Sequence, residues 1–186
     1  MKTRSWRALV AVVVGFALVG AGMSTANAAD SRKGSSSKGY TRVVVAPEVY
    51  NLIAGAGITP APIKPATAGP AGSTLAAKFP ISTVKLSKLQ IKHRGGLKLS
   101  AGSAKISLRD FTVDLNRLRV YGDVSGSVGR VKSAALFTLE RSDRTQYGSF
   151  RLALTATAAG ALNKTFGVDA FSAGATFGYA TVKPKA

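Results

Sequence analysis

His93 is the chain's single histidine and the residue best suited to acid–base catalysis. A Ser-His-Asp triad would require a serine such as Ser100 or Ser103 beside it and a carboxylate behind it. The sequence contains no Gly-x-Ser-x-Gly nucleophile motif. A hydrolase centred on His93 therefore rests on residue inventory alone, and we expect no catalytic residue.

The neighbours of His93 indicate a local structure instead. Lys92 and Arg94 flank the ring, and like charges disfavour its protonation. Gly95 and Gly96 follow directly, and such a pair is typical of a hairpin or a bulge. We interpret His93 as a surface or turn histidine.

Asp110 and Asp114 are the second candidate constellation. On a regular strand their α-carbons would lie roughly 13 Å apart, whereas the paired carboxyls of a retaining glycosidase lie about 5 Å apart. Lys105, Arg117 and Arg119 offer cross-strand partners. We interpret the two aspartates as part of a solvated charge ladder.

Sulfur chemistry is absent from most of the chain. There is no cysteine, and both methionines and the one tryptophan lie within the first 23 residues. Disulfides and thiolate metal ligands are therefore excluded. The eight acids and one histidine form no cluster with metal-ligand spacing, so we expect no metal site.

Alternating apolar residues between Phe79 and Val182 predict short β-strands. The alternation slips near Ser87-Lys88 and at Arg109-Asp110, and we predict a bulge at each place. Strands at roughly 8–12-residue spacing are typical of a sandwich or barrel. We predict an all-β fold, an antiparallel β-sandwich with two short helices.

Proline and glycine set the remaining elements. Pro47 to Ala54 is predicted as a short helix that Gly55 and Gly57 end. Ala156 to Phe166 is predicted as a second helix, closed by Gly167. Thr59 to Pro70 carries four prolines, so we expect an extended crossing.

The N-terminal segment has the layout of a secretory signal peptide. Three cations (Lys2, Arg4, Arg7) precede the sixteen-residue apolar run Ala8–Met23 and a small-residue site at Ala26-Asn27-Ala28. The run is shorter than the roughly 20 residues that span a bilayer. We predict a cleaved signal at 1–28, a flexible basic linker at 29–39 and one sandwich domain at 40–186. The mature protein would be secreted or associated with the cell wall, without a transmembrane anchor.

Positive charge dominates the predicted mature chain. The formal net charge is +18, of which the N-terminal head carries three, leaving +15. This excess favours anionic polymers or surfaces. The cations are spread along the chain without a base-stacking aromatic motif, so nucleic acid is not the expected natural partner. One hypothesis is therefore a structural or adhesion protein held by charge to anionic envelope polymers.

A set of landmarks between Val43 and Val182 resembles the Htaa family of secreted domains from Gram-positive bacteria, some of which bind haem. The landmarks are Phe79-Pro80-Ile81, Ile91-x-His93-x-Gly95-Gly96-Leu97, Asp110-Phe111-x-Val113-Asp114, Ala161-Leu162-Asn163, Phe166-Gly167, Ala170-Phe171, Gly174 and Gly178-x-Ala180-Thr181-Val182.

The resemblance implies an exported, non-catalytic binding protein that captures haem at the cell envelope. In haem-binding members a tyrosine from the N-terminal aromatic segment ligates iron and a histidine supports it. His93 falls where that histidine is expected, Tyr50 is the first candidate for the tyrosine, and Tyr40 is the second. The tryptophan of the family's tyrosine segment has no counterpart in the predicted mature chain. Haem is thus the one cofactor that the sequence suggests.

Overall fold

The computed structural model describes residues 38–185. The predicted signal peptide and nearly all of the predicted linker lie outside these residues. The described part contains eleven strands, two α-helices and one 3₁₀ turn. None of its helices combines the length and the apolar character needed to cross a membrane.

The elements follow one another along the chain as follows. They are β1 (Gly39–Val45), α1 (Pro47–Gly55), β2 (Thr59–Ile63), β3 (Thr67–Ala71), β4 (Thr74–Lys85), a 3₁₀ turn (Leu86–Lys88), β5 (Gln90–His93), β6 (Gly96–Ala101), β7 (Ala104–Asp114), β8 (Arg119–Gly126), β9 (Gly129–Arg141), β10 (Phe150–Leu154), α2 (Ala156–Phe166) and β11 (Thr176–Pro184).

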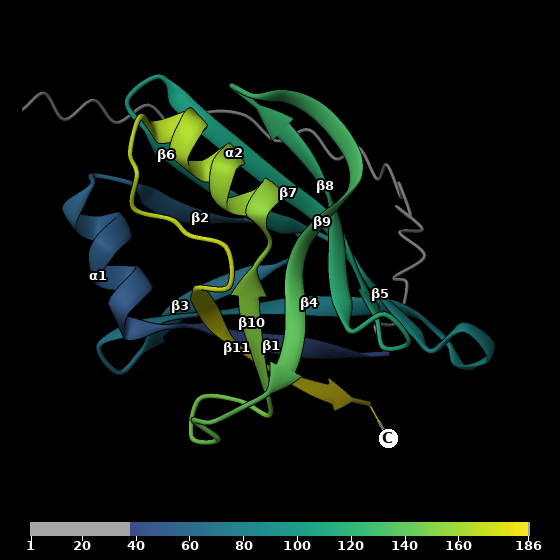
Figure 1. Ribbon diagram of the computed structural model, residues 1–186. Coiled ribbons are helices and arrows are strands. Elements are labelled where there is room, and N and C mark those ends of the chain that lie inside the picture. The colour runs from purple at the N-terminus through teal and green to yellow at the C-terminus, as the bar shows by residue number, and fades with distance from the viewer. Residues whose placement is uncertain (1–37, 186) are drawn as a thin grey trace, which may run out of the picture. The chain divides into compact units, whose positions relative to one another are not determined.

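The strands form one antiparallel sheet that closes on itself (Figure 1). Eight of them form the ring in the order β7-β5-β4-β1-β11-β10-β9-β8, and β8 pairs with β7 again. The antiparallel all-β prediction is confirmed, but the sandwich is wrong, because the ring is a closed barrel. Alternation of apolar residues is common to both architectures, so it does not report whether the outer strands of a sheet meet.

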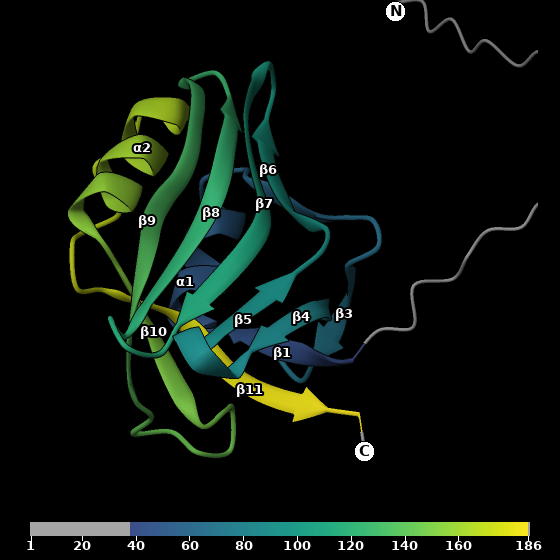
Figure 2. The same ribbon diagram turned by 90° about the vertical axis from the view of Figure 1, so that its right-hand side faces the viewer.

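A bulge in β7 makes this closure geometrically feasible. One edge of β7 pairs with β6 over residues 104–109 and with β5 over residues 112–114. The register against β8 shifts between Arg109 and Thr112, and Asp110 there has a φ of +52°. The bulge predicted at Arg109-Asp110 is therefore confirmed. It bends β7 away from β6, as bulges do, so that the strand can continue along the ring (Figure 2).

The bulge predicted near Ser87-Lys88 is wrong. Residues Leu86–Lys88 form the 3₁₀ turn, and Leu89 follows with a φ of +47°. The chain reverses here from β4 into its antiparallel neighbour β5. Leu86 and Leu89 are consequently exposed, at 78% and 47%, rather than on the inner face.

The proline-rich segment supplies two edge strands. β2 pairs with β6 and β3 pairs with β4, and neither has a partner on its other side within the described sheet. Proline lacks an amide donor and is confined to such edges. The extended course is as predicted, whereas the strand pairing was not foreseen.

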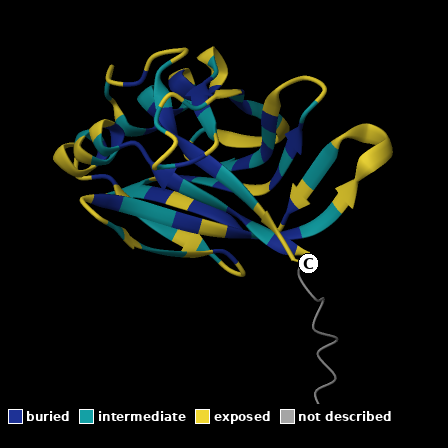
Figure 3. Cartoon of the chain, turned by 90° about the horizontal axis from the view of Figure 1, so that it is seen from below, coloured by how far each residue is buried: buried dark blue, intermediate teal, exposed yellow. Residues whose placement is uncertain are grey.

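Both helices start and end where the sequence indicates. Pro47 opens α1. The Thr155 hydroxyl accepts a hydrogen bond from the Ala158 amide at the start of α2, and Gly167 closes α2 with a φ of +66°. α1 packs against β4 and β11, and α2 packs against β7 and β9. Buried and exposed positions alternate along many of the strands (Figure 3).

Candidate functional site

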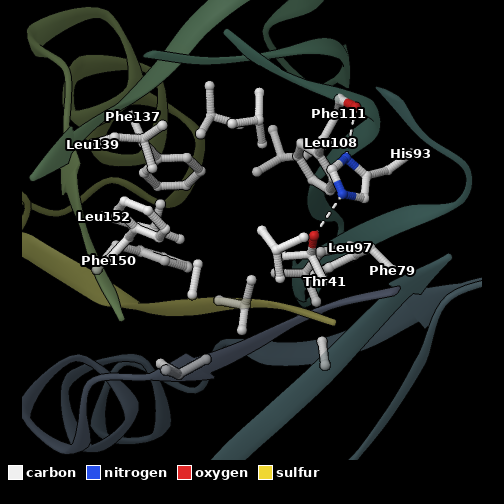
Figure 4. Close-up of a pocket in the computed structure, with 18 of the residues that line it drawn as sticks. Thr41, Phe79, His93, Leu97, Leu108, Phe111, Phe137, Leu139, Phe150 and Leu152 are labelled. Atoms are coloured by element: carbon white, nitrogen blue, oxygen red, sulfur yellow. Dashed lines mark hydrogen bonds between the residues drawn. The ribbon is translucent and has the colours of Figure 1, made fainter. Parts of the chain in front are cut away.

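The interior of the barrel holds an apolar cavity of about 80 Å³ (Figure 4). Inward-facing residues from β1, β4, β7, β9, β10 and β11 supply most of its wall. The lining residues include Val43, Val45, Phe79, Leu97, Leu108, Phe111, Val113, Phe137, Leu139, Phe150, Leu152, Phe177, Ala180 and Val182. Only Thr41 and His93 bring side-chain polar atoms to this wall.

His93 is buried, with 4% of its surface exposed. It ends β5 and lies opposite Ile81 of β4. Its Nδ1 lies 3.1 Å from the Phe111 carbonyl oxygen, and its Nε2 lies 2.7 Å from Thr41 Oγ1. A carbonyl can only accept, so Nδ1–H must donate to Phe111, and the neutral ring accepts the Thr41 hydroxyl proton at Nε2. Figure 4 shows both bonds, which connect β1, β5 and β7.

Burial lowers the pKa of His93, because the cationic ring loses hydration, and the Phe111 carbonyl opposes this effect. A neutral ring was expected because of repulsion from Lys92 and Arg94, but burial is the main cause of the lowered pKa. The interpretation of His93 as a surface or turn histidine is wrong. Its partners are a hydroxyl and a carbonyl, rather than the carboxylate that orients the base of a triad.

The stability of the barrel should fall as the pH drops from about 7 to about 5. Below about pH 6.5 the unfolded chain binds a proton at its one histidine, whereas the lowered pKa of folded His93 delays its protonation to lower pH. The unfolded state then holds more protons, so acid favours unfolding. The expected slope is up to about 1.4 kcal/mol per pH unit.

Urea unfolding followed at several pH values in this window measures that slope. The variant H93Q keeps a hydrogen-bonding side chain but cannot titrate, so its stability should be nearly flat over the same range. An equal slope in wild type and H93Q would assign the effect to another group.

A polar cavity of about 390 Å³ also borders His93. Its wall includes Ser82, Lys92, Arg94, Asp110, Thr112, Tyr121, Asp123 and Ser133. His93 therefore lies in the barrel wall between a polar groove and the apolar interior. Asp110 borders this groove as an exposed residue.

Asp114 departs from the predicted charge ladder, because it is buried, with 2% exposed. It accepts hydrogen bonds from the Arg117 backbone amide (3.0 Å), Arg117 Nη1 (3.0 Å) and Gln90 Nε2 (3.1 Å). The Arg117 amide, the Gln90 amide and the Arg117 guanidinium lower the pKa of Asp114. Asp114 stabilises the turn after β7 through its bonds to Arg117. Because the bulge shifts the register of β7 between Arg109 and Thr112, Asp114 is buried whereas Asp110 is exposed.

Tyr50 lies near the start of α1, where its amide donates to the Ala46 carbonyl at 2.9 Å. Its side chain is half-buried and packs against the core. Thr41, the partner of His93, lies four residues before Val45 at the end of β1, roughly 13 Å along the strand. α1 begins beyond that end, so the structure does not bring Tyr50 and His93 together.

Tyr40 precedes Thr41 on β1 and lies opposite Pro80 of β4. Successive side chains of a strand point to opposite faces, and Thr41 faces the interior, so Tyr40 faces outward. The Lys78 ammonium lies 5.3 Å from the centre of its ring. Tyr40 therefore belongs to the outer surface of the barrel.

Thr41 is the site residue that the sequence reasoning missed. It shares the inner face of β1 with Val43 and Val45, and the spacing of two residues between them is visible in the sequence. A hydroxyl in register with two inward valines could have indicated a buried polar partner. Nothing in the sequence indicates the role of the Phe111 carbonyl.

Comparisons with known proteins support the fold. No family model matches the chain, and no curated protein matches it. The crystal structure of the haem-binding protein HtaB from Corynebacterium glutamicum matches with a TM-score of 0.56 and 15% identity, over 77% of this chain and 90% of that chain. The C-terminal domain of HtaA from the same organism matches with a TM-score of 0.46 and 12% identity, over 76% and 93%. The expected Htaa-type fold is confirmed, and the chain has the fold of HtaB.

Proposed function

We propose that this chain is an exported, non-catalytic haem-binding protein. The observation that carries the proposal is the fold it has in common with HtaB, a haem-binding protein. A fold hosts many functions, so the proposal must also be compatible with this chain's own residues.

The barrel interior does not fit a haem. Its cavity measures about 80 Å³, whereas pockets for ligands of moderate size measure roughly 300–1,000 Å³. Aromatic and aliphatic core side chains surround it, so a porphyrin could enter only by opening the barrel. A bound haem must therefore lie outside this interior.

Tyr50 on α1 is the residue that would hold the iron of a bound haem. The residue is half-buried, and tyrosine is an established ligand of haem iron. When bound, the haem would supply an iron centre for the phenolate oxygen. His93 would then act on binding only through the stability of the barrel, because both of its ring nitrogens already have partners in the wall.

Haemin titration of the purified protein, followed by absorbance, tests the proposal. Binding to wild type should shift the Soret band of haemin. Y50F should bind haemin at least about tenfold more weakly, because the iron ligand is lost. Y40F is the matched control and should bind like wild type. H93Q should give the wild-type spectrum wherever the protein remains folded by circular dichroism.

Two outcomes would contradict the proposal. The absence of a Soret shift with wild type would remove haem as the ligand. Wild-type haemin affinity in the double variant Y50F/H93Q would remove the site. Binding to anionic envelope polymers stays a prediction from the net charge.

A further inference from the structure

A second apolar cavity, of about 230 Å³, lies between α2 and the inner face of β6–β9. Leu99, Ile106, Val124 and Leu136 line it from the strands, and Leu162 lines it from the helix. Figures 1 and 2 show α2 lying across this curved part of the sheet. We call this space the α2 groove.

The α2 groove adjoins the barrel interior. The two cavities have three lining residues in common, which are Leu108, Phe137 and Phe177. Phe137 and Phe177 contact each other with ring centres 5.2 Å apart. The two cavities therefore adjoin, and together they reach the lower end of the roughly 300–1,000 Å³ that ligand pockets measure.

Small residues on α2 create the groove. Ala158, Gly160 and Ala161 contribute to its wall where larger side chains would fill the space. Protein interiors are normally packed as densely as organic crystals, and unfilled apolar volume is destabilising. A helix that leaves such a gap over a sheet is suited to hold an apolar ligand.

The lining of the groove includes an exposed apolar residue and an exposed cation. Val131 is 51% exposed, and Lys164 on α2 is an exposed residue that lines the groove. No aspartate or glutamate is among the residues that line it. A ligand with an apolar body and an anionic end therefore matches both the wall and the rim.

We propose that the α2 groove binds the single unbranched chain of a free fatty acid, with the carboxylate at Lys164. A narrow, flexible chain suits a space of this combined size lined by aliphatic and phenylalanine side chains, and eight-stranded barrels can hold one small ligand. This site is separate from the haem site proposed at Tyr50, because Tyr50 does not line the groove.

Parinaric acid, a fluorescent fatty acid, tests the proposal by titration, with palmitate as the competitor. A161F places a large ring in the groove and should weaken binding by about tenfold or more. A156F is the matched control, because Ala156 is an exposed residue of the same helix that does not line the groove. Thermal unfolding of both variants verifies that they are folded.

Charge at the rim is tested in the same assay. K164E should weaken binding several-fold, whereas K183E, an equal charge change at an exposed position on β11, should not. The Y50F variant should bind parinaric acid like wild type, so a failed haem proposal leaves this result intact.

Four results would overturn the proposal: no binding by wild type, equal affinity in folded A161F, equal affinity for the uncharged alcohol of the same chain length, or binding to anionic vesicles only. Displacement of parinaric acid by one equivalent of haemin would overturn the separation of the two sites.

Discussion

Replacing Gly96 with alanine is expected to destabilise the barrel by about 3 kcal/mol, the upper end of the usual cost of overpacking. Gly96 opens β6 opposite Arg109 of β7. A β-carbon at this position would lie 2.0 Å from the Leu108 carbonyl oxygen and 3.0 Å from the Arg109 α-carbon. Both atoms belong to the backbone, so no side-chain rotation relieves the clash, and β6 would have to separate from β7.

Chemical denaturation of wild type and G96A measures this loss. G160A is the matched control, because a β-carbon at Gly160 meets no atom within 4 Å. Alanine is favoured over glycine inside a helix by about 1 kcal/mol, so G160A should be as stable as wild type or more stable. A stable G96A would mean that β6 and β7 do not approach each other as described.

Replacing Phe137 with alanine is expected to cost about 3–5 kcal/mol of unfolding free energy, the usual range for a buried phenylalanine. Phe137 is 6% exposed and lines both the barrel cavity and the α2 groove. Its removal would enlarge two spaces that are already unfilled. The surrounding barrel is closed, so it can relax only in part.

F150A is the matched control for this prediction. Phe150 lines the barrel cavity but is only partly buried, so its removal should cost clearly less than that of Phe137. Denaturant midpoints of the two variants give the comparison. Equal costs for F137A and F150A would contradict the placement of Phe137 between the two cavities.

Local structure was predictable from the sequence wherever a single residue constrains the backbone. Pro47 and Gly167 mark helix ends because of their backbone geometry, and both are found there. The β7 bulge was visible at Arg109-Asp110 as a slip in alternation. The slip at Ser87-Lys88 looked the same but is a turn, because alternation does not distinguish an inserted residue from a chain reversal.

Long-range features were not predictable in this way. Closure of the ring depends on β7 pairing with β8 on one edge and with both β5 and β6 on the other, which no local pattern encodes. The burial of His93 and Asp114 depends on partners distant in the sequence, such as Thr41 and Gln90. Charged neighbours in the sequence suggested solvent exposure, but the fold supplied buried partners instead.

Identifying the residue that would ligate the iron of a bound haem tests the central claim most directly. Resonance Raman spectroscopy of the haemin-loaded protein, excited in the ligand-to-iron charge-transfer band, should show tyrosinate vibrations in wild type and Y40F and lose them in Y50F. Two results would contradict ligation by Tyr50 and the function proposed from it. One is the absence of tyrosinate vibrations in haemin-loaded wild type, and the other is their persistence in haemin-loaded Y50F.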